Sequence, residues 1–488
     1  VLELNRRISK LLHFNNNDLD ANVDNDELIN SNNGLQNFFR LKNALNVKIV
    51  SKWNRVASIL KTLDMKANQK EYTTFRSNVQ GKKILVIGGG ISGLRVSIEL
   101  LLLGAKVICV EKRDEFTRNN VIHLWPSVIN DMCAFESKRF YGKFCVGSID
   151  HISIRQLQLI LLKIAIIYGL NFYTNTTFAE ICPRIIEPRF GRCSPQSCDC
   201  CCHQHGFGFG SYAHFTHTSV QDSTTQSYAN YLNRQSFDVI IGCDGRRHTF
   251  SRYFRRNNRR GKLAIGLTAN FINHRTEEEA QSEEISGTCR IYQQQWFQAL
   301  QDETGIELEN LVYYRDNTHY FVMTATKASL LLRGVLKTDY SDSHQLLSMN
   351  NIDTQKLMHY SKDAAEWSSK LRRLEFARNS NNMPDVALFD FTSMYSATNA
   401  SCAKKIHLRC CDTPVVMNAP ESSRYMLLLL CGDSLLEPFW PTGSGAGRGF
   451  LSAMDAAWTV AQWFTNVDDS YSIDSMLNVI SKREYIYR

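Results

Sequence analysis

The chain has 488 residues, of which 43% are hydrophobic and 21% are charged, and its net charge is +8. This length allows two or three domains with a sizeable core, and the composition excludes the disordered and fibrous classes of protein. No apolar run reaches the ~18 residues that a membrane-spanning helix requires, so we expect no membrane span.

Two features predict a cytoplasmic protein. The N-terminus carries charged residues at positions 3, 6 and 7 and has no apolar segment of the kind that a signal peptide contains. Fifteen cysteines are present, and Cys109, Cys243 and Cys431 lie in strand-like apolar runs. Buried single cysteines fit a reduced compartment better than a disulfide framework.

Residues 1–80 are predicted to form an N-terminal helical extension. The Asn/Asp-rich stretch 15–34 has the composition of a loose surface segment. The apolar positions after it recur at helical spacing, which predicts helices packed on the main domain. These positions are Leu41, Leu45, Ile49, Trp53, Val56 and Leu60.

Residues 83–114, KILVIGGGISGLRVSIELLLLGAKVICVEKRD, have the pattern strand, glycine turn, helix, strand. This is the pattern of a dinucleotide-binding unit, in which Gly88 permits the tight turn, Gly90 lets a pyrophosphate approach the backbone, and Gly93 lets the helix pack closely. Glu111 ends the second strand, where it can accept a hydrogen bond from a ribose hydroxyl. The alternative is a glycine-rich turn without a ligand, and this unit alone does not distinguish FAD from NAD(P).

The next elements return the chain to the same sheet. Residues 151–173 predict a long helix followed by a strand, and 237–243 predict a buried strand that ends at Asp244-Gly245. Residues 183–232 have the composition of an inserted loop. Its Cys198–His205 run is a poor metal site, because adjacent cysteines do not easily surround one tetrahedral ion, so we expect no metal.

A second half of a cofactor cradle lies near the C-terminus. The stretch 427–450, LLLLCGDSLLEPFWPTGSGAGRGF, is a buried strand that ends at Gly432-Asp433, followed by a loop and a small-residue helix start. A nicotinamide cofactor needs only one such unit, whereas a flavin dinucleotide bound across the domain uses both. The two halves together therefore indicate FAD.

These elements predict an α/β fold. A Rossmann-like FAD-binding domain with a parallel sheet is expected over 81–261 and 386–488. Alternating apolar runs predict a smaller, mainly antiparallel β domain on the substrate side over 262–385. No internal repeat is visible.

Basic residues are concentrated in one segment, Gly245–Lys262. Arginines this close repel one another and gain from an anionic partner, although a solvated surface is the simpler interpretation. No nucleic-acid module accompanies them, so we expect an acidic protein or a nucleotide phosphate as the partner, and no nucleic acid. The basic residues are Arg246, Arg247, Arg252, Arg255, Arg256, Arg259, Arg260 and Lys262.

The chain resembles the monooxygenase domain of the MICAL family, flavoenzymes that oxidise actin, within the class of p-hydroxybenzoate hydroxylase. The resemblance runs from about residue 40 to the end of the chain. It is carried by the stretches 111–126, 140–163, 245–265, 304–325 and 432–450.

The resemblance implies FAD and NADPH as cofactors, F-actin as the protein substrate, and a cytoskeletal location. An oxygen atom would be transferred to methionine sulfur, which makes a polar sulfoxide that disrupts actin contacts and promotes filament disassembly. Residues implied near the flavin ring are Trp440, His123 and Asn120. Cofactor-binding residues implied by the glycine unit and the resemblance together are Gly88, Gly90, Ser92, Gly93, Glu111, Lys112, Arg113, Arg118, Asn119, Asn120, Phe178, Tyr320 and Asp433.

The sequence departs from the family pattern in its turn, where Ile91-Ser92 stands in place of the usual Pro-Cys pair. Ser92 keeps a small polar side chain, so FAD binding is still expected. Two other functions remain open. One is an NADPH oxidase that releases hydrogen peroxide, and the other is an actin- or partner-binding module in which a flavin is only structural.

Overall fold

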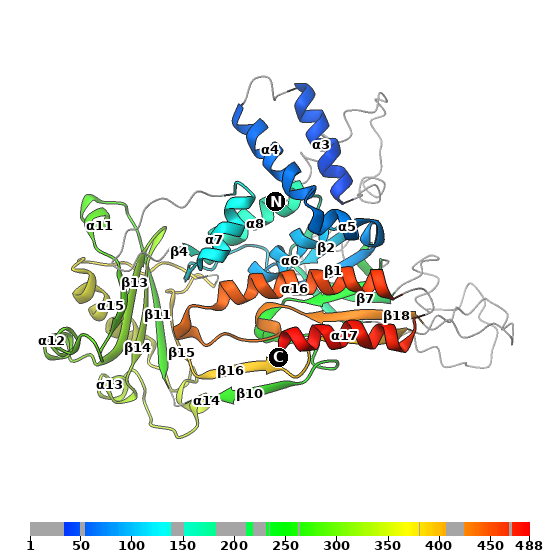
Figure 1. The fold of residues 1–488 in the computed structure, drawn as a ribbon. Coiled ribbons are helices and arrows are strands. Elements are labelled where there is room, and N and C mark those ends of the chain that lie inside the picture. The colour runs from blue at the N-terminus through cyan, green and yellow to red at the C-terminus, as the bar shows by residue number, and fades with distance from the viewer. Residues whose placement is uncertain are drawn as a thin grey trace.

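The computed structural model describes residues 34–48, 54–137, 151–181, 211–217, 231–233, 235–261, 264–379, 381–406, 424–467 and 471–488. These residues form two lobes, one around a six-stranded sheet and one around a five-stranded sheet (Figure 1).

The larger lobe contains the predicted parallel sheet. Five of its strands are parallel and lie in the order β18-β9-β1-β2-β5, and β17 pairs antiparallel with β18 at the edge. The central strands read as continuous apolar runs because both faces of the sheet are covered. Their bounds are β17 (Ser401–Ile406), β18 (Arg424–Leu430), β9 (Val239–Gly242), β1 (Lys83–Ile87), β2 (Lys106–Val110) and β5 (Asn171–Tyr173).

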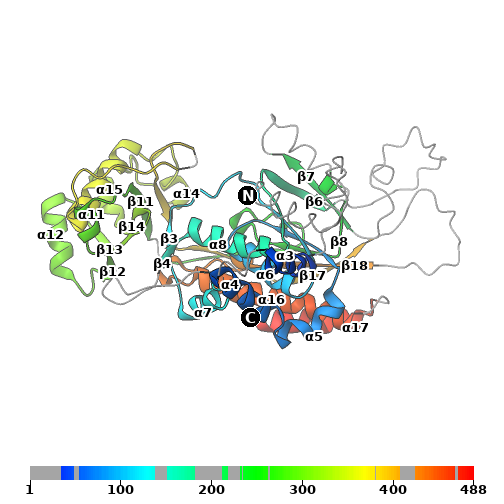
Figure 2. The same cartoon turned by 90° about the horizontal axis from the view of Figure 1, so that it is seen from above.

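Alternate residues of these strands enter two different cores. Val86 and Val107 pack with the helices, whereas Leu85 and Ile108 pack with Phe178 and its neighbours. Helices and the small sheet β6-β7-β8 accordingly lie on opposite faces (Figure 2). The covering elements are α5 (Lys70–Val79), α6 (Ile91–Leu102), α7 (Pro126–Ala134), α8 (Ile154–Ile167), α16 (Gly445–Asn466), α17 (Ile473–Tyr487), β6 (Thr176–Ile181), β7 (Ser211–His217) and β8 (Ser236–Phe237).

The predicted N-terminal helices are present as α3 (Leu35–Lys48) and α4 (Asn54–Ala67). Leu41 and Leu60 of the apolar stripe are buried, and Leu60 belongs to the same core as β1. The expected packing of these helices on the main domain is therefore confirmed. Ile49 and Trp53 lie outside the described residues, as does nearly all of the Asn-rich stretch.

The smaller lobe is an antiparallel sheet in the order β12-β13-β14-β11-β15. Five helices accompany this sheet, so the lobe is less purely β than the alternating apolar runs suggested. The strands are β11 (Ile265–Ile272), β12 (Ile285–Cys289), β13 (Leu308–Arg315), β14 (Thr318–Ala325) and β15 (Val386–Asp390), and the helices are α11 (Glu277–Gln281), α12 (Gln294–Thr304), α13 (Lys327–Leu332), α14 (Ser343–Leu346) and α15 (Thr354–Ser369).

Two antiparallel ribbons join the lobes. The ribbon of β3 (Val121–His123) and β4 (His151–Ser153) packs through Val121 against Tyr314 and Tyr320 of the five-stranded sheet. The ribbon of β10 (Arg256–Arg260) and β16 (Ser393–Ala397) runs between the lobes (Figure 1). The site is built where these ribbons meet the carboxyl ends of the parallel strands.

The segment 183–232 is not wholly a loop, because Ser211–His217 forms β7 and pairs with β6. Pairing with a neighbouring strand is a tertiary effect that the polar composition of this segment did not reveal. The Cys198–His205 run lies outside the described residues. Among the described helices, none is long and apolar enough to cross a membrane.

Candidate functional site

The glycine turn between β1 and α6 has the close contacts that its sequence predicts. Gly88 has φ +104°, and a Cβ at this position would lie 2.6 Å from the carbonyl oxygen of Cys243. A Cβ at Gly93 would lie 1.9 Å from the carbonyl oxygen of Gly88, whereas a Cβ at Gly90 would meet no atom within 4 Å. Two glycines are thus required by the protein itself, and Gly90 borders open space.

Glu111 closes the same turn from the end of β2. Its two carboxylate oxygens accept hydrogen bonds from the backbone N–H of Gly89, at 2.8 Å, and of Arg113, at 3.1 Å. Each oxygen keeps a second lone pair for a ligand hydroxyl. No side chain among the described residues caps α6, so its N-terminus presents backbone N–H groups and the positive end of the helix dipole to a phosphate.

The two halves of the cradle, far apart in sequence, touch in the structure. A Cβ at Gly432 or Gly449 would lie 2.3 or 2.6 Å from the hydroxyl of Ser92. The Oγ of Ser434 accepts from the backbone N–H of Gly245 at 2.7 Å and donates to the carboxylate of Asp244 at 3.0 Å. The ends of β9 and β18 are therefore bound to each other beside the glycine turn.

Three charged side chains converge here without partners. Arg113, Arg118 and Asp433 form no side-chain hydrogen bond or ion pair within the described part of the chain, and Arg118 feels the charges of both other residues. Burial lowers the pKa of Arg118. Burial raises the pKa of Asp433 to about 6, with a further contribution from Glu437, although Arg118 and two other arginines oppose the rise. The side chain of Asp433 is nevertheless accessible to solvent.

We expect Asp433→Asn to stabilise the FAD-free protein at pH 7. The folded-state pKa of about 6 lies above the ordinary aspartate value of 3.8, so at pH 7 the folded state carries a charge that it disfavours. The destabilisation caused by this charge is fully present above the folded-state pKa and disappears as the pH falls towards 4. Because Asp433 is partly exposed, solvent screening reduces the destabilisation that the pKa shift implies to about 1 kcal/mol. Thermal unfolding of the FAD-free protein at pH 7 and pH 4 measures the difference.

Asp390→Asn is the matched control with the opposite sign. Hydrogen bonds from Thr392 and the charge of Arg260 lower the pKa of Asp390 despite its burial, so its carboxylate contributes stability at pH 7 that is lost at low pH. Asp390→Asn should therefore lower the melting temperature at pH 7. Equal effects of the two substitutions would contradict the assignment of Asp433 as a strained carboxylate.

Asn119 and Asn120 connect the larger lobe to the antiparallel sheet. The side-chain amide of Asn120 donates to the hydroxyl of Tyr320 at 3.1 Å, and that of Asn119 donates to Asp385 at 3.3 Å. Tyr320 is buried, with 2% of its surface exposed. The structure thus brings the predicted residues Asn120 and Tyr320 together, and their hydrogen bond helps to hold the two lobes against each other.

Trp440 lies at the start of the loop before α16. Its ring is 45% exposed and packs edge-on against Phe389 of β15, with ring centroids 4.6 Å apart. His123 lies beside the same loop, because a Cβ at Gly443 would be 3.0 Å from its Nδ1 atom. The two residues expected near a flavin ring therefore border one loop, and the exposed indole is available to a ligand or partner.

Two other predicted residues lie differently. Phe178 is buried against Phe215 and Phe250, so its ring belongs to the core beneath the sheet and only its backbone is left to approach a ligand. Lys112 is exposed beside Glu111. Sequence reasoning missed Gln158, whose buried amide donates to the carbonyl oxygen of Gly89 at 3.0 Å. A glutamine within the apolar positions of α8 was the available signal.

The arginine-rich segment is less uniform than its sequence suggests. Arg246, Arg252 and Arg260 form ion pairs with Glu437, Glu180 and Asp390. Arg256 donates to the carbonyl oxygens of Gly245, at 2.7 Å, and Ser434, at 2.8 Å.

Arg255 and Arg259 are both exposed; Arg255 directly precedes β10, and Arg259 lies within it. Their side chains have no partner within the described ranges. The self-repulsion expected from the sequence is therefore partly relieved inside the chain, and Arg247, Arg255 and Arg259 remain exposed to an external anion.

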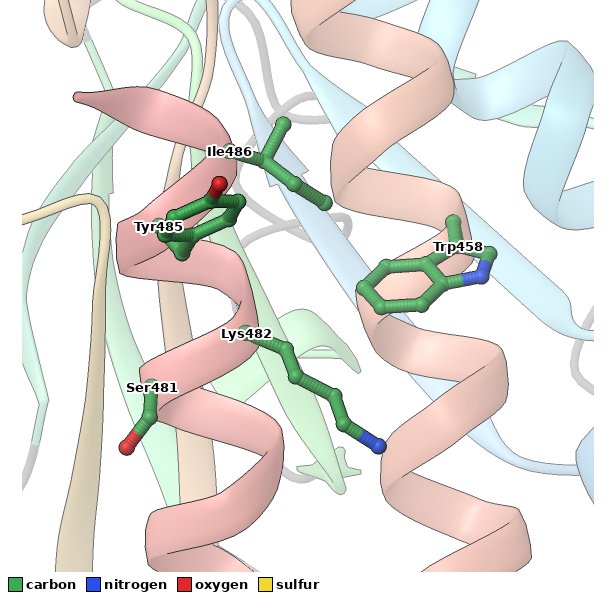
Figure 3. Close-up of a pocket in the computed structure, with 5 residues that line it drawn as sticks. All are labelled: Trp458, Ser481, Lys482, Tyr485 and Ile486. Carbon is green, nitrogen blue, oxygen red and sulfur yellow. The ribbon is translucent and has the colours of Figure 1, made fainter.

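An open groove of about 460 Å³ lies elsewhere, between α16 and α17, and has no predicted site residue in its lining (Figure 3). Trp458 on α16 faces Lys482 on α17 across it. We therefore place the candidate site at the glycine turn, where the three charged side chains converge, and not in this groove.

Known proteins resemble this chain over most of its length. The family described as "Mical, Rossman domain" matches residues 263–390, which form the antiparallel lobe rather than the glycine turn. Protein-methionine sulfoxide oxidase mical3a of Danio rerio is 46% identical over 446 residues, covering 90% of this chain and 20% of that protein. F-actin-monooxygenase MICAL3 of Homo sapiens is 45% identical over 445 residues, with the same coverage.

The chain spans about a fifth of the length of these relatives. Among solved structures, the flavin-dependent halogenase CmlS aligns with a TM-score of 0.47 at 12% identity, over 84% of this chain and 62% of that one. A structural similarity this distant carries no argument about function.

Proposed function

The chain belongs to the MICAL family, and from that membership we propose that it is an FAD-dependent monooxygenase that uses NADPH and oxidises methionines of F-actin to sulfoxide, which promotes filament disassembly. Relatives that it matches over nine-tenths of its length are named F-actin monooxygenases and methionine sulfoxide oxidases. The observation that supports catalysis in this part of the protein is the convergence of Arg113, Arg118 and Asp433 at the glycine turn.

The residues present fit FAD. The open space at Gly90 and the uncapped start of α6 suit a pyrophosphate, and Arg113 and Arg118 add fixed positive charge. Glu111 and Asp433 are placed to accept hydrogen bonds from sugar and ribityl hydroxyls. When bound, the flavin supplies the redox chemistry that no amino-acid side chain provides.

The chain's own residues would position the flavin ring and keep water from it. We propose that Trp440 and His123 border the ring and that Asn120 contacts its polar edge while Tyr320 holds the asparagine in place. The remaining proposed cofactor contacts are Gly88, Ser92, Gly93, Lys112, Asn119 and the backbone of Phe178. The domain division at residues 81, 262 and 386 is likewise part of this proposal, although β15, which begins at residue 386, pairs with β11 of the antiparallel sheet.

A methionine side chain fits the exposed side of this loop. The thioether is soft and makes favourable contacts with aromatic rings, and Trp440 presents a half-exposed indole. Arg255 directly precedes the strand β10 and Arg259 lies within it, where both would attract an acidic protein such as an actin filament. We propose a cytoplasmic protein that associates with the actin cytoskeleton.

The direct test is mass spectrometry of F-actin after incubation with the FAD-loaded protein and NADPH. We expect methionine sulfoxide of a single epimer on one or a few actin methionines, because an oxygen atom delivered within a site arrives from one side. NADPH consumption should rise when actin is added. The Gly90→Trp variant, which should lack FAD, serves as the control.

Catalase separates the alternatives. Sulfoxide that persists with catalase present supports direct transfer, whereas complete loss would show that free hydrogen peroxide is the oxidant and that the protein is an NADPH oxidase. A protein that binds actin and FAD but consumes no NADPH would be a binding module with a structural flavin.

A further inference from the structure

Two thiols face each other beneath the cradle. Leu430 of β18 pairs with Gly242 of β9, and the N–H of Cys431 donates to the carbonyl oxygen of Gly242 at 3.0 Å. Cys431 and Cys243, the next residues of two parallel neighbours, are therefore side by side. Strands in a sheet lie about 4.8 Å apart, which falls within the Cα separation of about 4.4–6.8 Å that a disulfide accepts.

Both side chains point to the helical face of the sheet. Cys431 belongs to the core on that face and Cys243 packs against it, together with Ile241 and Leu429 two positions earlier on the same strands. The two thiols are close enough for each to shift the pKa of the other. The pair therefore has the register, the face and the contact that a bond between the sulfurs requires.

A buried cation accompanies the pair. Arg483 of α17 is 1% exposed, and its one ion pair with a described residue is with Asp455 at 3.4 Å. Its Nε and Nη2 atoms have no hydrogen-bond partner among the described residues. The Cys243 thiol, the Ser452 hydroxyl and Arg483 lower the pKa of Cys431 against the effect of burial, whereas burial raises the pKa of Cys243. The negative charge of this pair is thus favoured on Cys431, with the proton on Cys243.

We propose that Cys243 and Cys431 form a reversible disulfide in response to hydrogen peroxide. The Cys431 thiolate attacks one oxygen of the peroxide, the O–O bond breaks, and the departing hydroxide takes the Cys243 proton and leaves as water. The Cys243 thiolate then attacks the sulfenic sulfur of Cys431, the S–O bond breaks, and the departing hydroxide takes up the proton that Cys431 released on ionising and leaves as a second water. In total, two thiols and one peroxide give one disulfide and two waters.

The bond would act on the cofactor cradle. A Cβ at Gly93 would lie 3.2 Å from the Cβ of Cys243, and one at Gly88 would lie 2.6 Å from the Cys243 carbonyl oxygen, so Cys243 packs directly against the glycine turn. The two sulfurs must approach to about 2.05 Å for the bond to form. That movement draws the ends of β9 and β18 together beneath the proposed pyrophosphate site, and we expect FAD affinity to fall on the order of tenfold.

The cross-link is tested directly on the wild-type protein. Trypsin releases Cys243 in the peptide 235–246 and Cys431 in the peptide 425–448, each with a single cysteine. After brief exposure to hydrogen peroxide, alkylation of free thiols and digestion, we expect the two peptides joined and lighter by two hydrogen atoms than their sum. Dithiothreitol should release them. Recovery of both peptides singly alkylated, or of Cys431 as sulfinic acid beside a free Cys243, would overturn the proposal.

FAD affinity, measured by flavin fluorescence, gives the second readout. The oxidised protein should bind FAD about tenfold more weakly, and reductant should restore the affinity. Cys431→Ser should make FAD affinity insensitive to peroxide, and Cys243→Ser serves the same purpose if the first variant does not fold. Cys109→Ser is the matched control and should respond like wild type. The experiment uses neither actin nor NADPH, so its result is independent of the proposed activity.

Discussion

Replacing Gly90 with tryptophan should give a folded protein that is colourless after incubation with FAD. A Cβ at this position meets no atom of the described residues within 4 Å, so we expect the substitution to leave the glycine turn intact. The indole fills the open space beside the start of α6, where we propose that the pyrophosphate binds. We expect FAD affinity to fall by about 100-fold or more, which corresponds to roughly 3 kcal/mol. Absorbance at the two flavin bands and a thermal melt measure both quantities.

Gly93→Ala is the informative comparison. Its single methyl group would lie 1.9 Å from the Gly88 carbonyl oxygen, so helix and strand must separate, and we expect a loss of stability of at least about 3 kcal/mol. Gly90→Trp should thus lose the cofactor and keep the fold, whereas Gly93→Ala should lose both. A yellow Gly90→Trp protein with normal FAD affinity would show that the pyrophosphate does not bind at this turn.

Neutralising Arg255 and Arg259 together should reduce actin-stimulated NADPH consumption about tenfold at low salt and leave FAD content unchanged. Both side chains are exposed and have no partner among the described residues, so their loss removes long-range attraction without breaking an internal contact. The difference should shrink as salt rises, because exposed charges more than ~8 Å apart are screened at physiological ionic strength.

Two further variants serve as controls for that result. Arg252→Gln removes one exposed charge that is paired with Glu180 and should have little effect. Arg256→Gln should instead reduce FAD content, because Arg256 holds the carbonyl oxygens of Gly245 and Ser434. If the double substitution raised only the KM for NADPH, equally with and without actin, the two arginines would serve the nucleotide and not the filament.

The glycine turn and the parallel strands could be predicted because their causes are local. A continuous apolar run, a Gly-x-Gly-x-x-Gly turn and an acid at the next strand end place β1, α6 and β2 without any tertiary information. The same holds for β9 and β18, whose apolar runs end at Asp244-Gly245 and Gly432-Asp433. The N-terminal helices could be predicted from the helical spacing of the apolar positions that include Leu41 and Leu60.

The sequence did not reveal which residues pair with each other when they lie far apart along the chain. The ion pairs of Arg246 and Arg260 divide the basic segment into internal and external residues, and only the tertiary structure identifies Glu437 and Asp390 as their partners. The strand β7 escaped prediction because its pairing with β6, and not its own composition, defines it. Phe178 was expected at the cofactor, but its ring lies in an aromatic core.

The sequence by itself determined the class of site, because cofactor chemistry depends on residue types at fixed local spacing: glycines where a Cβ has no room, and acids at strand ends. The tertiary structure decided which charges meet. Arg118 and Asp433 interact across more than half of the chain, and Cys243 and Cys431 become neighbours only through the register of β9 and β18. Register is set by packing over the whole sheet, and no local stretch of sequence contains that information.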